Sequence, residues 1–311
     1  MRDLLRVTDQ VRCYDHLGSE IPCRNSGQDA SQKPLEKQVV SSGKRFQAKG
    51  DFVVDSLTGH IWTLNANPAE YPLSWQEAHD FIVDMNENGY SGFSNWHLPD
   101  RKTLFSLISH QHVNPSLPKG HLFESVFPGY YWTADTCARL PDQAWYIHLG
   151  GGRIFRGMKH GAYLTWPVIP KIRDAGLVGS RFSQEDALIH DHQNSVSWLL
   201  GHRCFMDCLT WCDTLESIDR INRDKLFGCT RWRLPNIREL ESLVNIDTHS
   251  PAVFHPLRDS GIRPGYWSST TSVYEPRYAW VLYPRDGEVG VGFKQNPEFF
   301  GLALTDSLHI P

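Results

Sequence analysis

An internal duplication constrains the fold of this chain more than any other feature of its sequence. Ten of its eleven Trp residues form five matched pairs, and only Trp166 has no counterpart. The pairs are Trp62 with Trp198, Trp75 with Trp211, Trp96 with Trp232, Trp132 with Trp267, and Trp145 with Trp280. This match predicts two copies of one domain, at about residues 45–168 and 181–306. Each copy is long enough to bury its own core, which excludes a solenoid of short repeats.

Each copy carries the patterns of two helices followed by β-hairpins. Ser74 and Glu77 form a capping-box pattern, and the apolar spacing behind them predicts a helix whose twin starts near Thr210. After a Leu-Pro pair in each copy, Asp100 and Asn236 are suited to cap a second, shorter helix. Alternating apolar residues around turns fill the last third of each copy. We therefore predict an α+β fold, with two helices and one twisted antiparallel sheet in each copy.

Composition and charge exclude several classes of function. The chain has 31 Lys and Arg against 35 Asp and Glu, a net charge of −4. Binding to nucleic acid or to an anionic membrane by bulk electrostatics requires a basic excess, so neither partner is expected. No run of 18 apolar residues occurs, which argues against a membrane-spanning segment.

Residues 1–44 are predicted to form a turn segment and a flexible lead-in. The stretch 24–44 is rich in Ser, Gln and Lys, a composition typical of linkers. Charged residues interrupt the first ten positions, so no signal peptide is expected and the predicted location is the cytoplasm. If a leader was removed, the protein is instead secreted. Cys13 and Cys23 bracket a turn-like segment and would close a small loop in an exported protein.

Four cysteines are candidates for a metal site. They are Cys204, Cys208, Cys212 and Cys229. Zinc takes four Cys or His ligands, but its usual ligand spacing is tighter than the four-residue steps found here. The first copy has no cysteine at the matching positions, so the fold does not require these thiols. We predict buried free thiols, no metal and no other cofactor, with zinc as the alternative.

The motifs of the second copy resemble a known family. They are Trp232-Arg-Leu-Pro-Asn236, Glu239-Leu-Glu-Ser-Leu243, Tyr266-Trp-Ser-Ser-Thr270, Ala279-Trp280 and Lys294, with a looser version in the first copy. This set is similar to the C-terminal domain family of the Legionella collagen-like protein, a bacterial family of unknown function. The resemblance implies two tandem C-type-lectin-like domains, related in shape to formylglycine-generating enzymes. It also implies relatives that are mostly exported, some of which bind sulfated polysaccharides.

The sequence predicts a non-catalytic binding protein or protein–protein adaptor on this duplicated scaffold. An accessory subunit of a regulatory or defence assembly is one expectation within this class. No nucleophile-elbow or comparable catalytic context is present. The alternative is an exported adhesin for glycans or sulfated polysaccharides. A third interpretation is a formylglycine-generating-type oxidase, although Cys137 has no evident partner cysteine.

The predicted binding surfaces are two loops between matched aromatic anchors. They cover about residues 134–143 and 269–277, and their contents differ between copies while their spacing is equal. Tyr and Arg side chains are enriched at binding hot spots, and a short basic strand follows the first loop. The candidate binding residues are Tyr274, Arg277, Tyr278 and Arg285 in the second copy, with Arg153 and Arg156 in the basic strand of the first.

Overall fold

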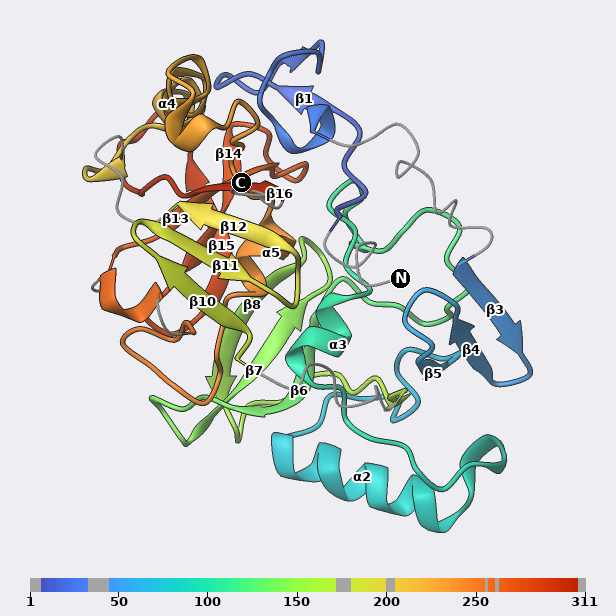
Figure 1. Cartoon of the computed structure of the whole chain (residues 1–311). Coiled ribbons are helices and arrows are strands. Elements are labelled where there is room, and N and C mark those ends of the chain that lie inside the picture. Colours follow the sequence, from blue (N-terminus) through green and yellow to red (C-terminus); the bar gives the residue numbers. More distant parts are fainter. Residues whose placement is uncertain are drawn as a thin grey trace. The chain divides into compact units, whose positions relative to one another are not determined.

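The structure, a computed structural model, describes residues 7–32, 45–171, 180–199, 205–254, 257–260 and 263–306 (Figure 1). It divides into two compact units, one for each copy of the duplication, called repeat 1 and repeat 2 below. The N-terminal segment, residues 7–32, belongs to the same unit as repeat 2. Among the described residues, none of the helices is both long and apolar enough to cross a membrane.

Repeat 1 consists of two helices and two antiparallel sheets. Its elements are β3 (Phe46–Lys49), β4 (Phe52–Asp55), β5 (Ile61–Thr63), α2 (Trp75–Glu87), the 3-10 turn η4 (Tyr90–Gly92), α3 (Arg101–Phe105), β6 (Tyr130–Thr136), β7 (Gln143–His148), β8 (Arg153–Met158) and β9 (Val168–Ile169). One sheet has the order β3-β4-β5-β9, and strands β6, β7 and β8 form successive hairpins.

Repeat 2 has the same elements in the same order. They are β10 (Phe182–Glu185), β11 (Leu188–Asp191), β12 (Val196–Leu199), α4 (Trp211–Arg223), η6 (Leu226–Gly228), α5 (Ile237–Glu241), η7 (Leu257–Ser260), β13 (Tyr266–Thr271), β14 (Tyr278–Tyr283), β15 (Glu288–Phe293) and β16 (Ala303–Asp306), η7 being an addition. Both copies have a register shift in the first hairpin, between Trp132 and Thr136 and between Trp267 and Thr271. The predicted α+β class is therefore confirmed.

The expectation of one sheet in each copy is wrong. The last strand of each copy leaves the hairpins and pairs with a strand near the start of the copy, β9 with β5 and β16 with β12. This return strand is only two residues long in repeat 1, Val168 and Ile169, which is too short to produce a recognisable alternation. It adds a second, four-stranded sheet to each repeat.

The predicted helix starts are confirmed by their hydrogen bonds. Ser74 and Glu77 form a reciprocal capping box at α2, and Asn236 and Glu239 form one at α5. Thr210 caps α4 through the backbone N–H of Asp213. These caps satisfy N–H groups that the first turn of a helix leaves without partners, and they fix where each helix begins.

The matched residues Trp96 and Trp232 are both buried, with 1% and 2% of their surfaces exposed. An Asn on the long helix holds each one. The N–H of Trp96 donates to Oδ1 of Asn86 at 2.7 Å, and Nδ2 of Asn86 donates back to the Trp96 carbonyl. Asn222 makes the same pair of bonds with Trp232. In each copy, the bonds between this Trp and the Asn therefore join the Leu-Pro turn to the long helix.

A buried ion pair joins the first two strands of each repeat. Arg45 donates from Nε and Nη2 to the two carboxylate oxygens of Asp55, and Arg181 does the same to Asp191. Each Arg also donates to a backbone carbonyl behind the short helix, Ser106 in repeat 1 and Ser242 in repeat 2. These bonds offset the cost of removing both charges from water.

Candidate binding surface

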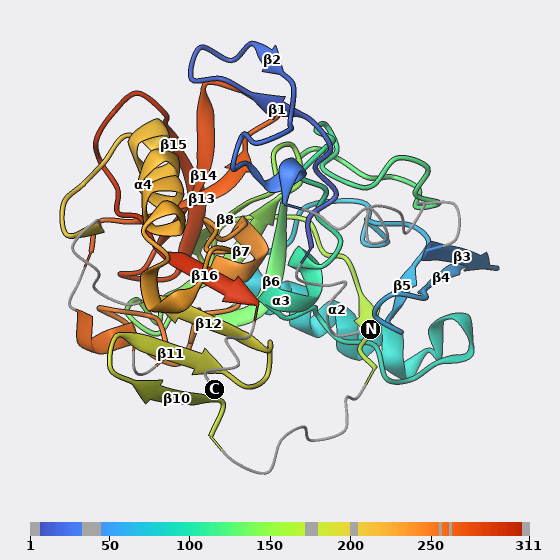
Figure 2. The same ribbon diagram turned by 45° about the horizontal axis from the view of Figure 1, so that its top comes forward.

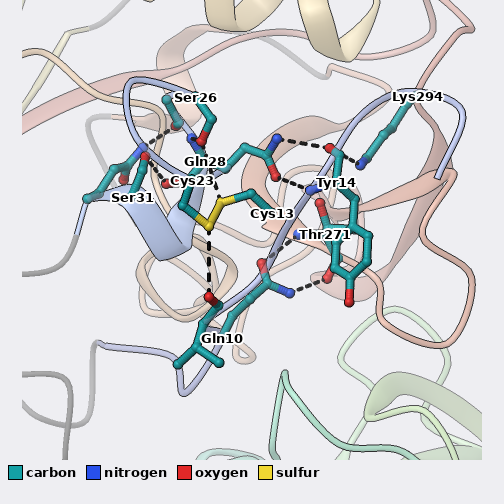
Figure 3. The surroundings of a disulfide bond; sticks show 12 residues. Gln10, Cys13, Tyr14, Cys23, Ser26, Gln28, Ser31, Thr271 and Lys294 are labelled. Atoms are coloured by element: carbon teal, nitrogen blue, oxygen red, sulfur yellow. Dashed lines mark hydrogen bonds between the residues drawn. A yellow bond between two sulfur atoms is a disulfide. The ribbon is translucent and has the colours of Figure 1, made fainter. Parts of the chain in front are cut away.

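The N-terminal segment is packed against repeat 2 and closed by a disulfide between Cys13 and Cys23 (Figure 3). It contains the short strands β1 (Cys13–Tyr14) and β2 (Glu20–Ile21) and the 3-10 turn η2 (Asp29–Ser31). In Figures 1 and 2, β1 and β2 lie beyond one end of strands β14 and β15. A stretch of chain from outside the duplication therefore covers one face of repeat 2.

Residues 24–32 correct the prediction of a flexible lead-in. The side-chain amide of Gln28 donates to the Tyr14 carbonyl at 2.9 Å, and its Oε1 accepts from the Tyr14 N–H at 3.0 Å. Gln28 thereby bonds both backbone groups of Tyr14, as a neighbouring strand would. Only 2% of Gln28 and of Asp29 is exposed. Composition suggested a linker, whereas Gln28 bonds the backbone of Tyr14 and Asp29 bonds two threonine hydroxyls. Residues 33–44 lie outside the described part of the chain.

Lys294 is the centre of the contact. It has no exposed surface, and its Nζ donates to the backbone carbonyls of Tyr14 and Asp15, each at 3.1 Å. The ammonium lies 4.1 Å from the ring centroid of Trp211, a distance suited to a cation–π contact. Burial lowers the pKa of Lys294 to about 7, although Cys212 and Asp15 act to raise it. The N-terminal segment that Lys294 bonds therefore also excludes this lysine from solvent.

Two further anchors lie beside Lys294. The amide of Gln10 forms a cyclic pair with the backbone of Thr271, with N···O distances of 2.7 and 3.0 Å. Oδ2 of Asp29 accepts from the hydroxyls of Thr8 at 2.6 Å and Thr270 at 2.8 Å. The Thr270 hydroxyl in turn accepts the first N–H of α5, from Ile237, at 3.1 Å. The segment thus supplies a carboxylate toward the start of α5, where a negative charge is favourable.

We call Trp211, Thr270, Thr271 and Lys294 the covered face of repeat 2. All four residues are buried. The face binds its segment mainly through main-chain groups, since Lys294 receives two carbonyls and Thr271 offers its own N–H and carbonyl. The two carbonyls bonded by Lys294 are main-chain groups that any polypeptide offers, whereas the contacts at Thr271 and Thr270 use the side chains of Gln10 and Asp29.

Repeat 1 has the same face, and in the described part of the chain no segment covers it as residues 7–32 cover repeat 2. Its residues are Trp75, Asp135, Thr136 and Lys159, which we call the open face; all four are partly exposed. Nζ of Lys159 lies 4.2 Å from the Trp75 ring centroid, and the ring of His79 packs edge-on against Trp75 at 4.3 Å. Burial lowers the pKa of His79, with Asp80 acting to raise it and Lys159 to lower it further.

The predicted second loop is exposed only in part. Tyr274 is 59% exposed, and Arg277 is exposed and pairs with Glu275, with Nε 3.0 Å from Oε1. Strand β13, however, continues through Thr271, and Ser272 beyond it is buried. The expectation of an exposed loop from residue 269 is therefore wrong for 269–272, because the N-terminal segment packs against these polar residues.

The first loop departs from the prediction in the same way. Strand β6 runs to Thr136, and Cys137 is buried with 1% of its surface exposed. Among residues 134–143, only Pro141 and Asp142 are fully exposed. The bulged pairing of β6 with β7 explains this, since it extends the strand into the segment that was expected to leave the sheet.

The structure does not gather the candidate binding residues into one surface. Tyr278 is partly buried at the start of β14 beside Arg277, whereas Arg285 is exposed in the turn beyond the other end of that strand. Five residue steps of about 3.4 Å put the two ends roughly 17 Å apart. In the basic strand, Arg153 and Arg156 are both partly buried and stand at positions of opposite parity, so they point to opposite faces of the sheet.

The cysteine candidates show no metal geometry in the part of the chain that is described. There, no group of three or more His, Cys, Asp or Glu side chains is arranged to hold an ion. Cys208 and Cys212 are partly buried, and burial raises the pKa of Cys212. Cys229 is buried with Sγ 3.5 Å from the Thr305 hydroxyl. Cys204 lies outside the described residues.

Sequence reasoning missed the residues that carry this surface. Lys159 and Lys294 match between the copies, but the sequence shows only that the position is shared. It does not show which residues either lysine contacts. Gln10, Gln28 and Asp29 lie in a segment without a counterpart in the duplication. The one available signal was the pair Cys13 and Cys23, because a disulfide closes a segment that is meant to keep its shape.

Comparison with known proteins identifies the repeated domain. The model of the Lcl C-terminal domain matches the chain twice, over residues 51–169 and 187–302. The two matches cover well over half of the chain and coincide with the two repeats. Among curated proteins, no match is found.

Proposed function

We propose that this chain, which belongs to the Lcl C-terminal domain family, is a non-catalytic binding protein that joins other polypeptides as an adaptor. One observation carries the proposal. Repeat 2 already holds a polypeptide, residues 7–32, on a face made of a lysine, a tryptophan and a strand end. Because repeat 1 carries the same elements, the scaffold offers this kind of face twice.

The finer fold assignment is part of the proposal. In each repeat, the last strand returns to pair near the start of the domain, and both helices precede the hairpins. This closed arrangement supports a C-type-lectin-like domain, a scaffold that tolerates variable loops because its Trp core is independent of them. Tyr274 and Arg277 remain the loop residues best placed for a partner, since both are exposed.

A binding role also accounts for the buried lysine and the buried thiols. A buried lysine with a lowered pKa is a frequent mark of a catalytic site. Here Lys294 is covered by Tyr14 and Asp15 and satisfied by their carbonyls, so it holds a segment in place. The thiols of Cys137 and Cys229 are buried, whereas reactive thiols are usually reachable from solvent.

The disulfide favours the exported alternative over the cytoplasmic one. Disulfides persist in oxidising compartments and are rare in reducing ones. In native cells, trapping of thiols with an alkylating reagent should leave Cys13 and Cys23 unlabelled without prior reduction. Labelling of both would support a cytoplasmic protein.

To test the adaptor proposal, the tagged full chain is crosslinked in native cells and purified with its partners. A glycan array run in parallel tests the adhesin alternative. We expect a protein partner at stoichiometric yield, and a yield that falls in the double variant Tyr274→Ala, Arg277→Ala with the melting temperature unchanged. Tyr71→Ala, at an exposed aromatic residue of repeat 1, is the control. Saturable glycan binding without any protein partner would replace the adaptor with the adhesin.

A further inference from the structure

The two repeats differ most clearly in what covers one shared face. In repeat 2, Trp211, Thr270, Thr271 and Lys294 are all buried under residues 7–32. Their four counterparts in repeat 1 are all partly exposed. At all four matched positions, the residue of repeat 1 is more exposed than its counterpart in repeat 2. We expect this pattern when a binding face is filled in one copy and accessible in the other.

The geometry of the face is the same in both copies. The N–H of Trp75 donates to the Lys159 carbonyl at 2.9 Å, and that of Trp211 donates to the Lys294 carbonyl at 3.0 Å. Lys159 and Lys294 lie over the matching tryptophans at 4.2 and 4.1 Å. Lys159 therefore occupies in repeat 1 the position that Lys294 occupies in repeat 2. From that position Lys294 donates to two carbonyls.

The strand end is also positioned alike. Thr136 pairs with Ala144 and Thr271 pairs with Ala279, each after a register shift that starts at a matched Trp. Because the register is equal, the main-chain N–H and carbonyl of Thr136 have the direction of those that bond Gln10 in repeat 2. The open face thus has counterparts of the groups with which Lys294 and Thr271 bond the segment in repeat 2.

The side chains around these contacts differ in charge. Asp135 stands where repeat 2 has Thr270, and Asp142 stands where it has Arg277. Oδ2 of Asp135 accepts the first N–H of α3, from Arg101, at 2.6 Å. In repeat 2 the carboxylate at this point comes from the bound segment, through Asp29. In repeat 1 it comes from the scaffold, so a second carboxylate from a ligand would be repelled.

We infer that the open face of repeat 1, formed by Trp75, Asp135, Thr136 and Lys159, is a docking site for a turn of a partner polypeptide that carries a basic side chain. The carbonyls of the turn accept from Lys159, and a Lys or Arg of the turn pairs with Asp135 at the place that Asp29 takes in repeat 2. This inference rests on the proposed adaptor function and names the chemistry of its partner.

A synthetic peptide tests the site directly. The probe is the disulfide-closed peptide of residues 7–32 with Asp29→Lys, labelled with a fluorophore and titrated with the full chain by anisotropy. We expect saturable binding that weakens at least tenfold in Lys159→Ala. Asp135→Asn, which keeps an acceptor for the Arg101 N–H, should also weaken it.

Two controls show whether the probe binds at the open face and through its basic side chain. Lys119→Ala, at an exposed lysine of the same repeat, should bind the probe like the unmodified chain. The peptide with the native Asp29 should bind at least tenfold more weakly than the probe. Binding that survives Lys159→Ala but is lost in Lys294→Ala would show exchange at repeat 2 and overturn the inference, as would absence of binding at 0.1 mM in about physiological salt.

Failure of the inference and failure of the adaptor proposal give different results. A stoichiometric protein partner whose yield ignores both Lys159→Ala and Asp135→Asn would refute the docking site and leave the adaptor intact. Probe binding that depends on Lys159, in a chain that yields no protein partner from native cells, would support the site and refute the adaptor.

Discussion

Replacement of Lys294 by Met should abolish a rise in the stability of repeat 2 between pH 7 and 8.5. Burial lowers the pKa of this lysine from 10.5 to about 7 in the folded protein. Between these two values the unfolded chain holds the proton and the folded chain has released it. Because the unfolded state binds more protons in this window, the free energy of unfolding increases with pH.

The size of the rise follows from the titration of one group. Above the folded pKa, the slope approaches about 1.4 kcal/mol per pH unit, and at pH 7 it is about half of that. Integrated from pH 7 to 8.5, the gain is roughly 1.5–2 kcal/mol. Burial raises the pKa of the neighbouring Cys212. Its opposing contribution, a loss of stability as pH rises through the ordinary pKa of a thiol, starts at about pH 8.5 and offsets only a small part of the gain.

Chemical denaturation at pH 7.0 and 8.5 measures the effect. The unmodified chain should gain stability in the transition that includes repeat 2, and Lys294→Met should not. Lys159→Met is the matched control because Lys159 lies over its tryptophan in the same way but is partly exposed. Equal slopes for the unmodified chain and Lys294→Met, or an equal loss in Lys159→Met, would refute the argument that the cover over Lys294 removes its proton.

Four further variants test the packing. Trp232→Ala should lower the free energy of unfolding by roughly 3–5 kcal/mol, the range for large buried aromatics, and an unchanged denaturation midpoint would contradict its burial. Asp55→Ala should cost about 3–5 kcal/mol because it strands a buried arginine. Asp191→Ala should cost less, since the side chain of its arginine is 17% exposed against 7% in repeat 1; equal losses would disprove this ranking. Changing both Cys13 and Cys23 to Ser should destabilise the docked segment by about 2–3 kcal/mol, seen as faster proteolysis of residues 7–32, whereas unchanged cleavage would mean that the hydrogen bonds suffice.

The sequence predicted the parts of the fold that repeat. Matched Trp residues located both copies, and the capping residues Ser74 and Asn236 located two helix starts that the structure confirms. These signals are local, because a cap is read within one turn and a Trp pair needs only a constant offset. The ion pairs of Arg45 and Arg181 were visible only as matched positions, since the sequence does not show which carboxylate faces which guanidinium.

The binding surface could not be predicted because its contacts are made between distant residues. Lys294 bonds a carbonyl 280 positions away, and Gln10 bonds a strand end 261 positions away. The register shift of the first hairpin extends β13 through Thr270 and Thr271, which were expected in a loop, and the N-terminal segment bonds both residues. In sequence alone, polar residues such as Gln10 and Gln28 cannot be told from those of a linker. Only the structure shows the backbone groups that they bond.

The asymmetry between the repeats gives the duplication a functional meaning. Two identical copies would both need a covering segment or would both present a face to solvent. Here residues 7–32 bring a carboxylate to repeat 2, and Asp135 brings one from within repeat 1. The scaffold carboxylate of Asp135 bonds the start of α3 directly, and within the described ranges the residues of this face are partly exposed. Under the docking site that we propose, one filled and one accessible face would let a single chain keep a defined fold and receive a partner, and the charge at residue 135 would then select a basic partner over an acidic one.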